Sequence, residues 1–432
     1  MRIALIILAT VAGLPVNASE SRSATLTSDL SYGHALQDPR SMQGVLEVTP
    51  ALEFSSSPNE LLVLSARLRL DLEDRLEPGR PDTNSFAPLS EPLVLGNTGT
   101  IELRDVYWER RFKRGLLRIG KQQIVWGRLD GIKVLDVVNP QDFREFIIDD
   151  FADSRISLWS AYLDARSAHW RAEFALVPDS SAHAIPVTDA WFALRAPRFQ
   201  FGNAGDANNV AIDTDRPGHQ FRDAGFGLRL SHQFGGTELA LIAYSGVDPE
   251  PLGRSRIASG RPVIERYFKR RETFGLSADM GLGNSVLRTE YAYQPGRRFN
   301  RNMNGQLSAV ALEQHRVAIG LDVTGPWQSF INIQYLLDHV RAAPVDLVRP
   351  ARDQVATLFI RRAFVQDTVT VTARWYHSLS DHDSMLVAGI RMDLSDATAL
   401  DISAQSSSGT SRGLFGQFEK QDRLLVSLQH TF

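Results

Sequence analysis

The sequence predicts an all-β fold, a single transmembrane antiparallel β-barrel of about 16–18 strands with long external loops, one of which we expect to fold into the lumen. Three observations predict it. Segments of about ten residues alternate apolar and polar side chains, the chain begins with an export signal but has no later spanning helix, and it ends in an amphipathic segment whose last residue is Phe432.

Composition excludes several classes of function. The 432 residues carry 47 Lys and Arg against 50 Asp and Glu, a net charge of −3, and no basic block stands apart, so nucleic acid is not an expected partner. The chain has no cysteine, which excludes disulfides, thiolate nucleophiles and cysteine-based metal sites. That absence also suits a protein that crosses an oxidising periplasm unfolded.

Residues 1–18 resemble a cleaved secretory signal peptide. Met1-Arg2 gives a positive start, 3–14 an apolar core, and Val16-Asn17-Ala18 a small-residue cleavage site, which leaves 19–432 as the mature barrel. The apolar core is shorter than the ~20 residues that span a bilayer, and no later run reaches that length. An exported chain of this kind is therefore either soluble or a closed barrel.

Alternation at period two defines the strands. In 61–74 the even positions are mostly Leu, whereas the odd ones include Ser65, Arg67 and Asp71, so one face suits lipid and the other water. A soluble β-sandwich would show the same alternation, so a single strand does not separate the two folds.

The lengths of the connections favour the barrel. Those after even-numbered strands are tight, such as Gly235-Gly236, whereas those after odd-numbered strands include 75–99, 127–153 and 179–221; 380–383 is a short exception. Short turns are expected in the periplasm and long loops outside. A count of 16 strands stays open, because 24–33 or 189–199 could be assigned otherwise. The expected strands are 24–33, 43–54, 61–74, 100–112, 115–126, 154–164, 168–178, 222–234, 237–246, 264–281, 285–294, 308–323, 327–339, 353–364, 367–379, 384–394, 398–408 and 422–432.

The last segment places Leu424, Val426, Leu428, His430 and Phe432 on one face. It resembles the terminal strand of bacterial outer-membrane barrels, which the barrel-insertion machinery recognises through the final Phe and the alternating hydrophobic residues. His430 departs from the pattern, which usually has an aromatic residue there. The resemblance implies a bacterial outer-membrane location, with outer-membrane lipid and this machinery as partners.

A second resemblance lies in 119–155. Gly120-Lys121-Gln122 precedes Trp126-Gly127, and Asn139-Pro140-Gln141-Asp142 follows. This order is similar to the signature of an uncharacterised porin-like outer-membrane family, Gly-Lys/Arg-Gln, Trp-Gly and Asn-Pro-x-Asp. The loop at 127–153 is the third external one, and in general porins that loop folds inward and narrows the pore.

Charges suggest how such a constriction could sort solutes. Five acidic residues lie between Asp142 and Arg155 against two basic ones, and Arg67, Arg69, Arg104, Arg118 and Lys121 could face them from the wall, giving a transverse field. The alternative is that the loop charges are solvated and the wall charges pair with each other. The candidate constriction residues are Trp126, Arg128, Asp130, Lys133, Asp136, Asn139, Asp142, Arg144 and Asp149 in the loop, with Arg67, Arg69, Arg118 and Lys121 on the wall.

Apolar residues in the same loop, including Val134, Leu135, Phe143 and Phe146, have two interpretations. Packing as a small core is favoured, and an apolar path for an amphipathic or aromatic solute is the alternative. No catalytic constellation, metal motif or cofactor motif is recognisable, and 213–218 has only the start of a calcium loop.

The predicted function is a porin-like channel for passive uptake of a small solute, amphipathic or aromatic if the apolar path is used. A plugged barrel that acts as a scaffold for a partner is the alternative, and an outer-membrane enzyme is less favoured. Many porins are trimers, but the outward faces show no patch that decides between a monomer and a homotrimer.

Overall fold

The computed structural model describes residues 21–37, 41–129, 131, 133–147, 154–199, 211–215 and 222–432. The expected signal peptide, 1–18, lies outside the described residues.

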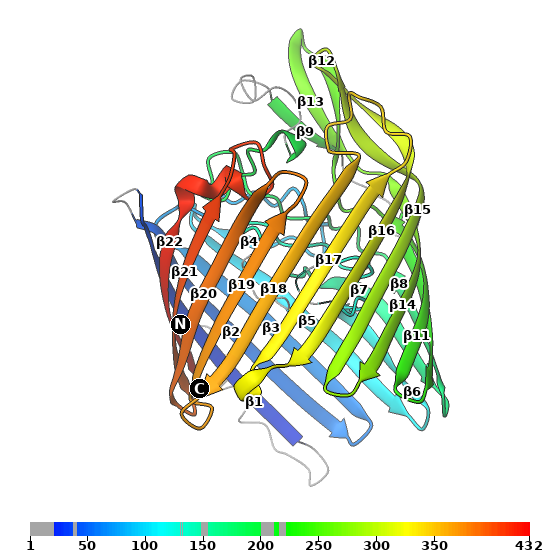
Figure 1. Cartoon of the computed structure of the whole chain (residues 1–432), viewed down its shortest axis with the longest axis vertical. Helices are drawn as coiled ribbons and strands as arrows, with labels where there is room; N and C mark the ends of the chain where they lie inside the picture. Colours follow the sequence, from blue (N-terminus) through cyan, green and yellow to red (C-terminus); the bar gives the residue numbers. More distant parts are fainter. Residues whose placement is uncertain are drawn as a thin grey trace.

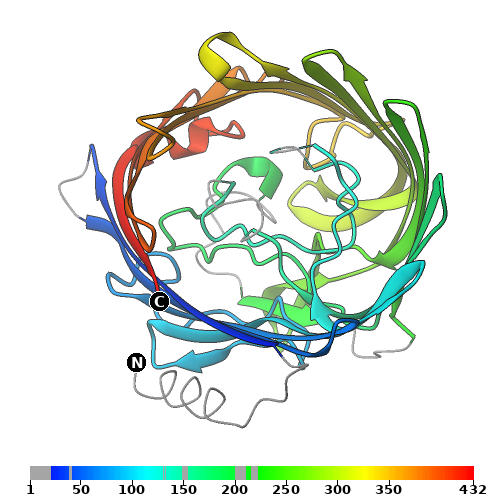
Figure 2. The ribbon, with the colours of Figure 1, turned by 90° about the horizontal axis from the view of Figure 1, so that it is seen from below.

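A closed antiparallel barrel of 18 strands forms the molecule (Figures 1 and 2). Each strand pairs with the next along the chain, and the first pairs with the last through the register Thr27↔Thr431 to Ala35↔Arg423. The barrel strands are β1 (Ser21–Ala35), β2 (Ser41–Ser57), β3 (Glu60–Asp71), β5 (Gly99–Phe112), β6 (Gly115–Gln122), β7 (Leu158–Arg166), β8 (Trp170–Val177), β10 (Gly225–Phe234), β11 (Thr237–Val247), β14 (Arg270–Leu282), β15 (Ser285–Met303), β16 (Gln306–Thr324), β17 (Phe330–Val340), β18 (Arg352–Phe364), β19 (Val369–Ser378), β20 (Asp383–Ser395), β21 (Thr398–Ser408) and β22 (Arg423–Thr431).

Every one of the predicted segments overlaps one barrel strand, so the count of 18 is confirmed and the alternative of 16 is wrong. Residues 189–199 form no strand and end in a 3-10 turn, Pro197–Phe199. Two boundaries were wrong for one reason. The strand predicted at 115–126 ends at Gln122 and the one predicted at 154–164 begins at Leu158, because the chain between them leaves the wall for the lumen.

The two ends of the barrel differ as predicted. Tight turns such as Gly235-Gly236 join the strands at one end, and the long connections lie at the other. At the long-loop end a small separate sheet, β12 (Leu252–Ala258), β13 (Arg261–Tyr267) and β9 (Ala211–Asp215), stands above the rim in Figure 1. The strand predicted at 264–281 is therefore two strands: its first residues belong to β13 of this small sheet, and the rest belong to β14 of the barrel. A three-residue strand, β4 (Leu93–Leu95), pairs with β5.

Side chains point alternately outward and into the lumen. In β10, Phe226 and Leu228 are exposed on the outer face, whereas Arg229 and Ser231 are buried inside. The apolar exterior and polar interior are the reverse of a soluble globule, and they match a wall surrounded by lipid. Within the described residues, no helix is long and apolar enough to cross a bilayer.

The lumen is not empty. In Figure 2 the chain of 123–147, in cyan, and that of 178–199, in green, cross the interior of the barrel. They contribute Trp126, Leu135, Val138 and Phe192 to a buried apolar cluster that they form together with side chains of the wall. The prediction that the apolar residues of the third loop pack together therefore holds for these side chains.

The lipid-facing wall predicts that Leu228→Arg destabilises the barrel. A cation at mid-bilayer on the outer face costs about 2–4 kcal/mol, and one near the interface about 0–1 kcal/mol. Leu228 lies in the middle of β10, whereas Phe234 ends the strand at a tight turn and is also exposed. We expect urea titration in lipid bilayers to show the larger loss of unfolding free energy for Leu228→Arg than for Phe234→Arg. Equal losses would argue against a membrane around this face.

Candidate functional site

Residues 123–157, named here the lumen loop, leave the wall after β6 and return to it at β7. Asn139 joins the two ends of this excursion. Its Oδ1 accepts a hydrogen bond from the backbone N–H of Ile124 at 2.8 Å, and its Nδ2 donates one to the carbonyl of Ile156 at 2.7 Å. A short amide side chain that both accepts and donates can close a loop in this way. The Asn-Pro pair of the signature thus has a structural role at the base of the loop.

Inward-facing glycines let the lumen loop lie directly against the wall. A Cβ at Gly227 of β10 would lie 2.3 Å from the indole of Trp126, and one at Gly275 of β14 would lie 2.3 Å from Leu135. On β16, a Cβ at Gly320 would lie 2.5 Å from Leu129. Real side chains do not approach that closely, so only glycine permits these three contacts. The lumen loop is therefore packed onto β10, β14 and β16.

Glu290 of β15 adds a polar attachment. Its carboxylate accepts backbone hydrogen bonds from Leu135 at 2.9 Å and from Arg128. These donors would otherwise be unpaired in a buried place, which would destabilise the loop. Sequence reasoning missed Glu290. Its signal was the alternation Arg288, Glu290, Ala292, which places a carboxylate on the inner face of β15 opposite the loop.

The predicted charges around β3, β5 and β6 form close ion pairs. Arg67 lies 2.8 Å from Glu102 of β5 and 3.6 Å from Asp142 of the lumen loop. Arg144 contacts Asp142 and lies 2.9 Å from Glu77, and Arg69 contacts Glu47. Burial alone would raise the pKa of Asp142, but the guanidinium of Arg144 outweighs it and holds the pKa well below its usual range. Among the described residues on this side of the lumen, the loop charges Asp142 and Arg144 are buried and paired, so they are neither solvated nor facing an open basic wall.

The other two predicted wall residues, Lys121 and Arg118, do not line the cavity described next. Lys121 is buried at the end of β6. Arg118 lies nearer the tight-turn end, with its Nε 2.5 Å from Glu109 and its guanidinium over the ring of Tyr107.

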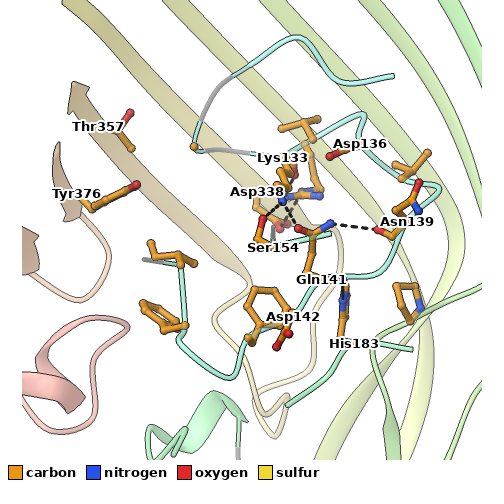
Figure 3. Close-up of a pocket in the computed structure, with 18 of the residues that line it drawn as sticks. Lys133, Asp136, Asn139, Gln141, Asp142, Ser154, His183, Asp338, Thr357 and Tyr376 are labelled. Carbon is orange, nitrogen blue, oxygen red and sulfur yellow. Dashed lines mark hydrogen bonds and ion pairs between the residues drawn. The ribbon is translucent and has the colours of Figure 1, made fainter. Parts of the chain in front are cut away.

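The open space lies on the opposite side, between the lumen loop and the wall from β14 to β19. A cavity of about 570 Å³ occupies it. Figure 3 shows some of the residues that line it. Among the described residues that line it, seven are cationic and four are carboxylates. Six of the cations are arginines, which define the arginine-lined cavity: Arg271, Arg297, Arg316, Arg349, Arg361 and Arg374.

Most of these arginines have partners that leave a positive excess. Asp248 lies 3.1 Å from Arg271 and 2.7 Å from Arg297, and Glu250 lies 2.6 Å from Arg297, so two carboxylates face these two arginines. Asp338, by contrast, is shared by Arg316, at 3.4 Å, and Arg349, at 3.1 Å. One carboxylate between two guanidinium groups neutralises only one of them, so a positive excess lies at Arg316 and Arg349. Nearer the tight turns, the guanidinium of Arg361 lies over the ring of Phe330 and that of Arg374 over Phe359.

Four of the predicted loop residues line this cavity, namely Lys133, Asp136, Asn139 and Asp142. In Figure 3 Lys133 lies beside Gln141 and Ser154, and its Nζ is 2.9 Å from the hydroxyl of Ser154. Burial lowers the pKa of Lys133 to about 8, although Asp136 opposes this. Burial also raises the pKa of Asp136, against the effect of Arg155 at 2.6 Å.

Three other predicted loop residues that the structure describes, Trp126, Arg128 and Arg144, do not line the cavity. Trp126 is buried against the wall, and Arg144 is buried behind Asp142. Arg128 pairs with Glu238 at 2.6 Å and with Asp279 at 3.4 Å, both on neighbouring wall strands. Asp130 and Asp149 lie outside the described residues.

His183, from the connection between β8 and β10, completes the lining. Its Nδ1 accepts a hydrogen bond from the backbone N–H of Gln141 at 2.8 Å, which requires that nitrogen to be unprotonated. Burial lowers its pKa to about 3, so the ring is neutral at physiological pH and adds no charge. Among the described residues, no group of three or more His, Asp or Glu is arranged to hold a metal ion.

The arginines of β14 to β19 were the main omission of the sequence analysis. Their signal was present in part, because Arg316 and Arg374 alternate with outward-facing apolar residues on their strands. Which wall the loop leaves open could not be read from alternation, since that depends on where the loop packs.

Comparison with solved structures agrees with this architecture. OccK2 (OpdF) of Pseudomonas aeruginosa has a TM-score of 0.53 at 11% identity, with 95% of this chain and 98% of that chain covered. OpdK of the same organism, in a structure with vanillate, has a TM-score of 0.50 at 10% identity and the same coverage, 95% and 98%. At these identities the likeness shows a common fold only. No curated protein matches the sequence.

The sequence analysis predicted membership of an uncharacterised porin-like family, and this prediction can be compared with a family model. A family model described as "Protein of unknown function (DUF1302)" matches residues 95–389, a segment that contains the whole lumen loop and the wall opposite it. Because this match covers more than half of the chain, the protein belongs to the DUF1302 family.

Proposed function

We propose that this protein is an outer-membrane channel through which a small anionic solute diffuses passively. The observation that carries the proposal is the arginine-lined cavity, which lies inside a closed barrel and holds seven cationic side chains against four carboxylates. A water-filled passage with an excess of one charge concentrates ions of the opposite sign and excludes its own.

The membrane location is part of the same proposal. It is supported by the closed sheet and by the apolar outer face, including Phe226 and Leu228. We propose that residues 1–18 direct export, that the β22 strand ending at Phe432 engages the insertion machinery, and that outer-membrane lipid surrounds the wall. The long connections then face outward and the tight turns face the periplasm. A homotrimer stays a prediction that cross-linking in native membranes can test.

Passage requires binding that is weak enough to release. An anion entering the cavity exchanges hydrogen bonds with water for charge-assisted ones with guanidinium groups. Asp338 and Asp248 already pair with four of these arginines, so the anion competes with a resident carboxylate and its net gain is small. A series of such shared arginines allows an anion to move from one to the next.

The predicted constriction residues divide into two roles in this proposal. Lys133, Asp136, Asn139 and Asp142 border the passage. Trp126, Arg128 and Arg144 hold the lumen loop in place, and Arg67 supports it from the wall through Asp142. Arg69, Arg118 and Lys121 belong to the wall itself.

The solute that we propose is small, and the apolar loop residues favour an amphipathic or aromatic one. The solved structures of OpdK and OccK2 contain vanillate and glucuronate respectively, which are both carboxylates. Passive uptake of a carboxylate is compatible with the positive excess of the cavity here.

A plugged barrel that serves as a scaffold is the second candidate. The observation favouring it is the close packing of Trp126, Leu129 and Leu135 against wall glycines, which fills part of the lumen. The two candidates differ in conductance.

Replacing 132–150 by a short Gly/Ser linker is expected to enlarge single-channel steps of the refolded mature protein in planar bilayers. The loop occupies the lumen, so its removal widens the path for ions. A point variant makes the same test. Gly275→Val places a side chain where Leu135 packs, so it is expected to displace the loop and enlarge the steps. Gly281→Val is the control, because its side chain meets nothing closer than 3.6 Å, and it is expected to leave the steps unchanged. If intact and loop-deleted barrels are both silent although they migrate as folded barrels on gels, the channel proposal fails and the scaffold remains.

Arg361→Gln is expected to reduce the preference for chloride over potassium roughly twofold, since one charge about 8 Å from an ion in water contributes ~0.5 kcal/mol. The matched control is Arg362→Gln. Arg362 lies next in the chain but on the outer face, against the rings of Trp327 and Phe364. Reversal potentials in a salt gradient measure the permeability ratio of chloride to potassium. An equal effect of the two variants, or a cation preference in the intact barrel, would contradict the assignment of the passage.

A further inference from the structure

A second hollow, of about 370 Å³, adjoins the arginine-lined cavity and is mainly apolar. The two share lining residues, among them Phe143, Phe146 and Tyr376, so they form one connected space. We name the second hollow the apolar vestibule. Its apolar lining comes from several separate segments and comprises Phe143, Phe146, Ile147, Ile185, Leu194, Phe199, Leu336, Val355, Tyr376, Leu414 and Phe415.

The vestibule lies nearer the long-loop end than the lower arginines do. On β18, Val355 lines the vestibule, and Thr357, Phe359 and Arg361 follow it along the inner face toward the tight turn. Leu414 and Pro251 belong to long connections outside the barrel strands. A solute that enters from the long-loop end therefore meets apolar side chains before it meets Arg361.

Four cations line the vestibule: Arg198, which pairs with Asp353 at 2.6 Å and with Asp381, and three that also line the cavity, Lys133, Arg316 and Arg349. Arg316 and Arg349 line both spaces, and their guanidinium groups share the single carboxylate of Asp338, at 3.4 Å and 3.1 Å. Gln314 donates a further hydrogen bond to Asp338 at 2.6 Å, so this carboxylate is already engaged by three groups. A second anion that takes over one of the two guanidinium groups therefore leaves Asp338 with two of its three partners.

An apolar vestibule next to a pair of arginines favours one class of solute over others. A hydrophilic anion could use the arginines but would leave the vestibule apolar and unfilled. A neutral apolar solute could fill the vestibule but would form no ion pair with the cations beside it. A solute with an apolar body and one anionic group satisfies both regions, and each methylene that it buries raises affinity roughly fourfold.

We propose that the vestibule and the adjoining arginines form a binding site for an amphipathic monocarboxylate, whose apolar body lies among Phe143, Leu336 and Val355 and whose carboxylate lies between Arg316 and Arg349. This inference rests on the proposed function, because it names the solute of the same passage. The body and the charged group are recognised by different residues, so the two contributions can be tested apart.

The test measures how 3-phenylpropionate, gluconate and 3-phenylpropionamide interrupt the single-channel current of the full mature chain. We expect 3-phenylpropionate to give half-maximal block at a concentration at least tenfold below that of either other compound. Gluconate lacks the apolar body, and the amide lacks the charge. Equal block by the two carboxylates, in a channel that conducts and prefers anions, would overturn this inference and leave the proposed function standing.

A matched pair of variants locates the apolar contribution. Val355→Thr introduces a hydroxyl of similar size into the vestibule, whereas Val387→Thr makes the same change on β20, at a position that lines neither space. We expect Val355→Thr to weaken block by 3-phenylpropionate severalfold without changing block by gluconate, and Val387→Thr to change neither. Equal effects of the two variants would place the apolar contribution elsewhere and count against the site.

A further pair locates the charge. Arg349→Gln is expected to weaken block by both 3-phenylpropionate and gluconate. Arg352 is an exposed residue at the start of β18, and Arg352→Gln is expected to change block by neither compound. If no version conducts, the proposed function fails, and calorimetric titration of the detergent-solubilised chain with 3-phenylpropionate still decides the site. Binding that Val355→Thr weakens would support it, and no binding would overturn it.

Discussion

The backbone pairing of β1 with β22 is the interaction on which the rest of this structure depends. Phe432 donates a backbone hydrogen bond to Leu26 at 3.0 Å, and the ladder continues to Ala35↔Arg423, so the sheet has no free edge. Lipid offers no partner for a bare N–H or carbonyl, and closure is the only way for strands to satisfy these groups there. Closure also creates an inner face, and a lumen in which polar side chains, loops and water can lie.

The lumen in turn explains the behaviour of the third loop. Its apolar residues cannot face the water of an open passage at low free energy, so they pack against one side of the wall. Glycines at 227, 275 and 320 make that side smooth enough for Trp126, Leu135 and Leu129 to lie against it. Packing on one side leaves space on the other, and the position of the cavity follows from where the loop is attached.

The pairing of charged side chains also differs between the side of the lumen where the loop packs and the side that it leaves open. Where the loop and wall are in contact, as at Asp142, Arg144 and Arg67, buried charges must pair closely, because an unpaired buried charge strongly destabilises a fold. Where the loop leaves space, arginines such as Arg316 and Arg349 can share one carboxylate, because water compensates for the remainder. The residues closest to the predicted signature thus stabilise the loop, and the side chains suited to a solute lie on the wall facing it.

The sequence by itself determined the barrel, a count of 16–18 strands and the two unlike ends. These features are local, since alternation at period two and turn length are read within about ten residues. The inward path of the third loop was an expectation taken from the resemblance to porins. Only the tertiary structure decided which charges are paired and which line a cavity. Arg67 and Arg316 occupy equivalent inward positions on their strands, yet one is closed off by Asp142 and the other borders open space. That difference arises from contacts between residues far apart in the chain, such as Leu135 with Gly275, which no pattern within one strand contains.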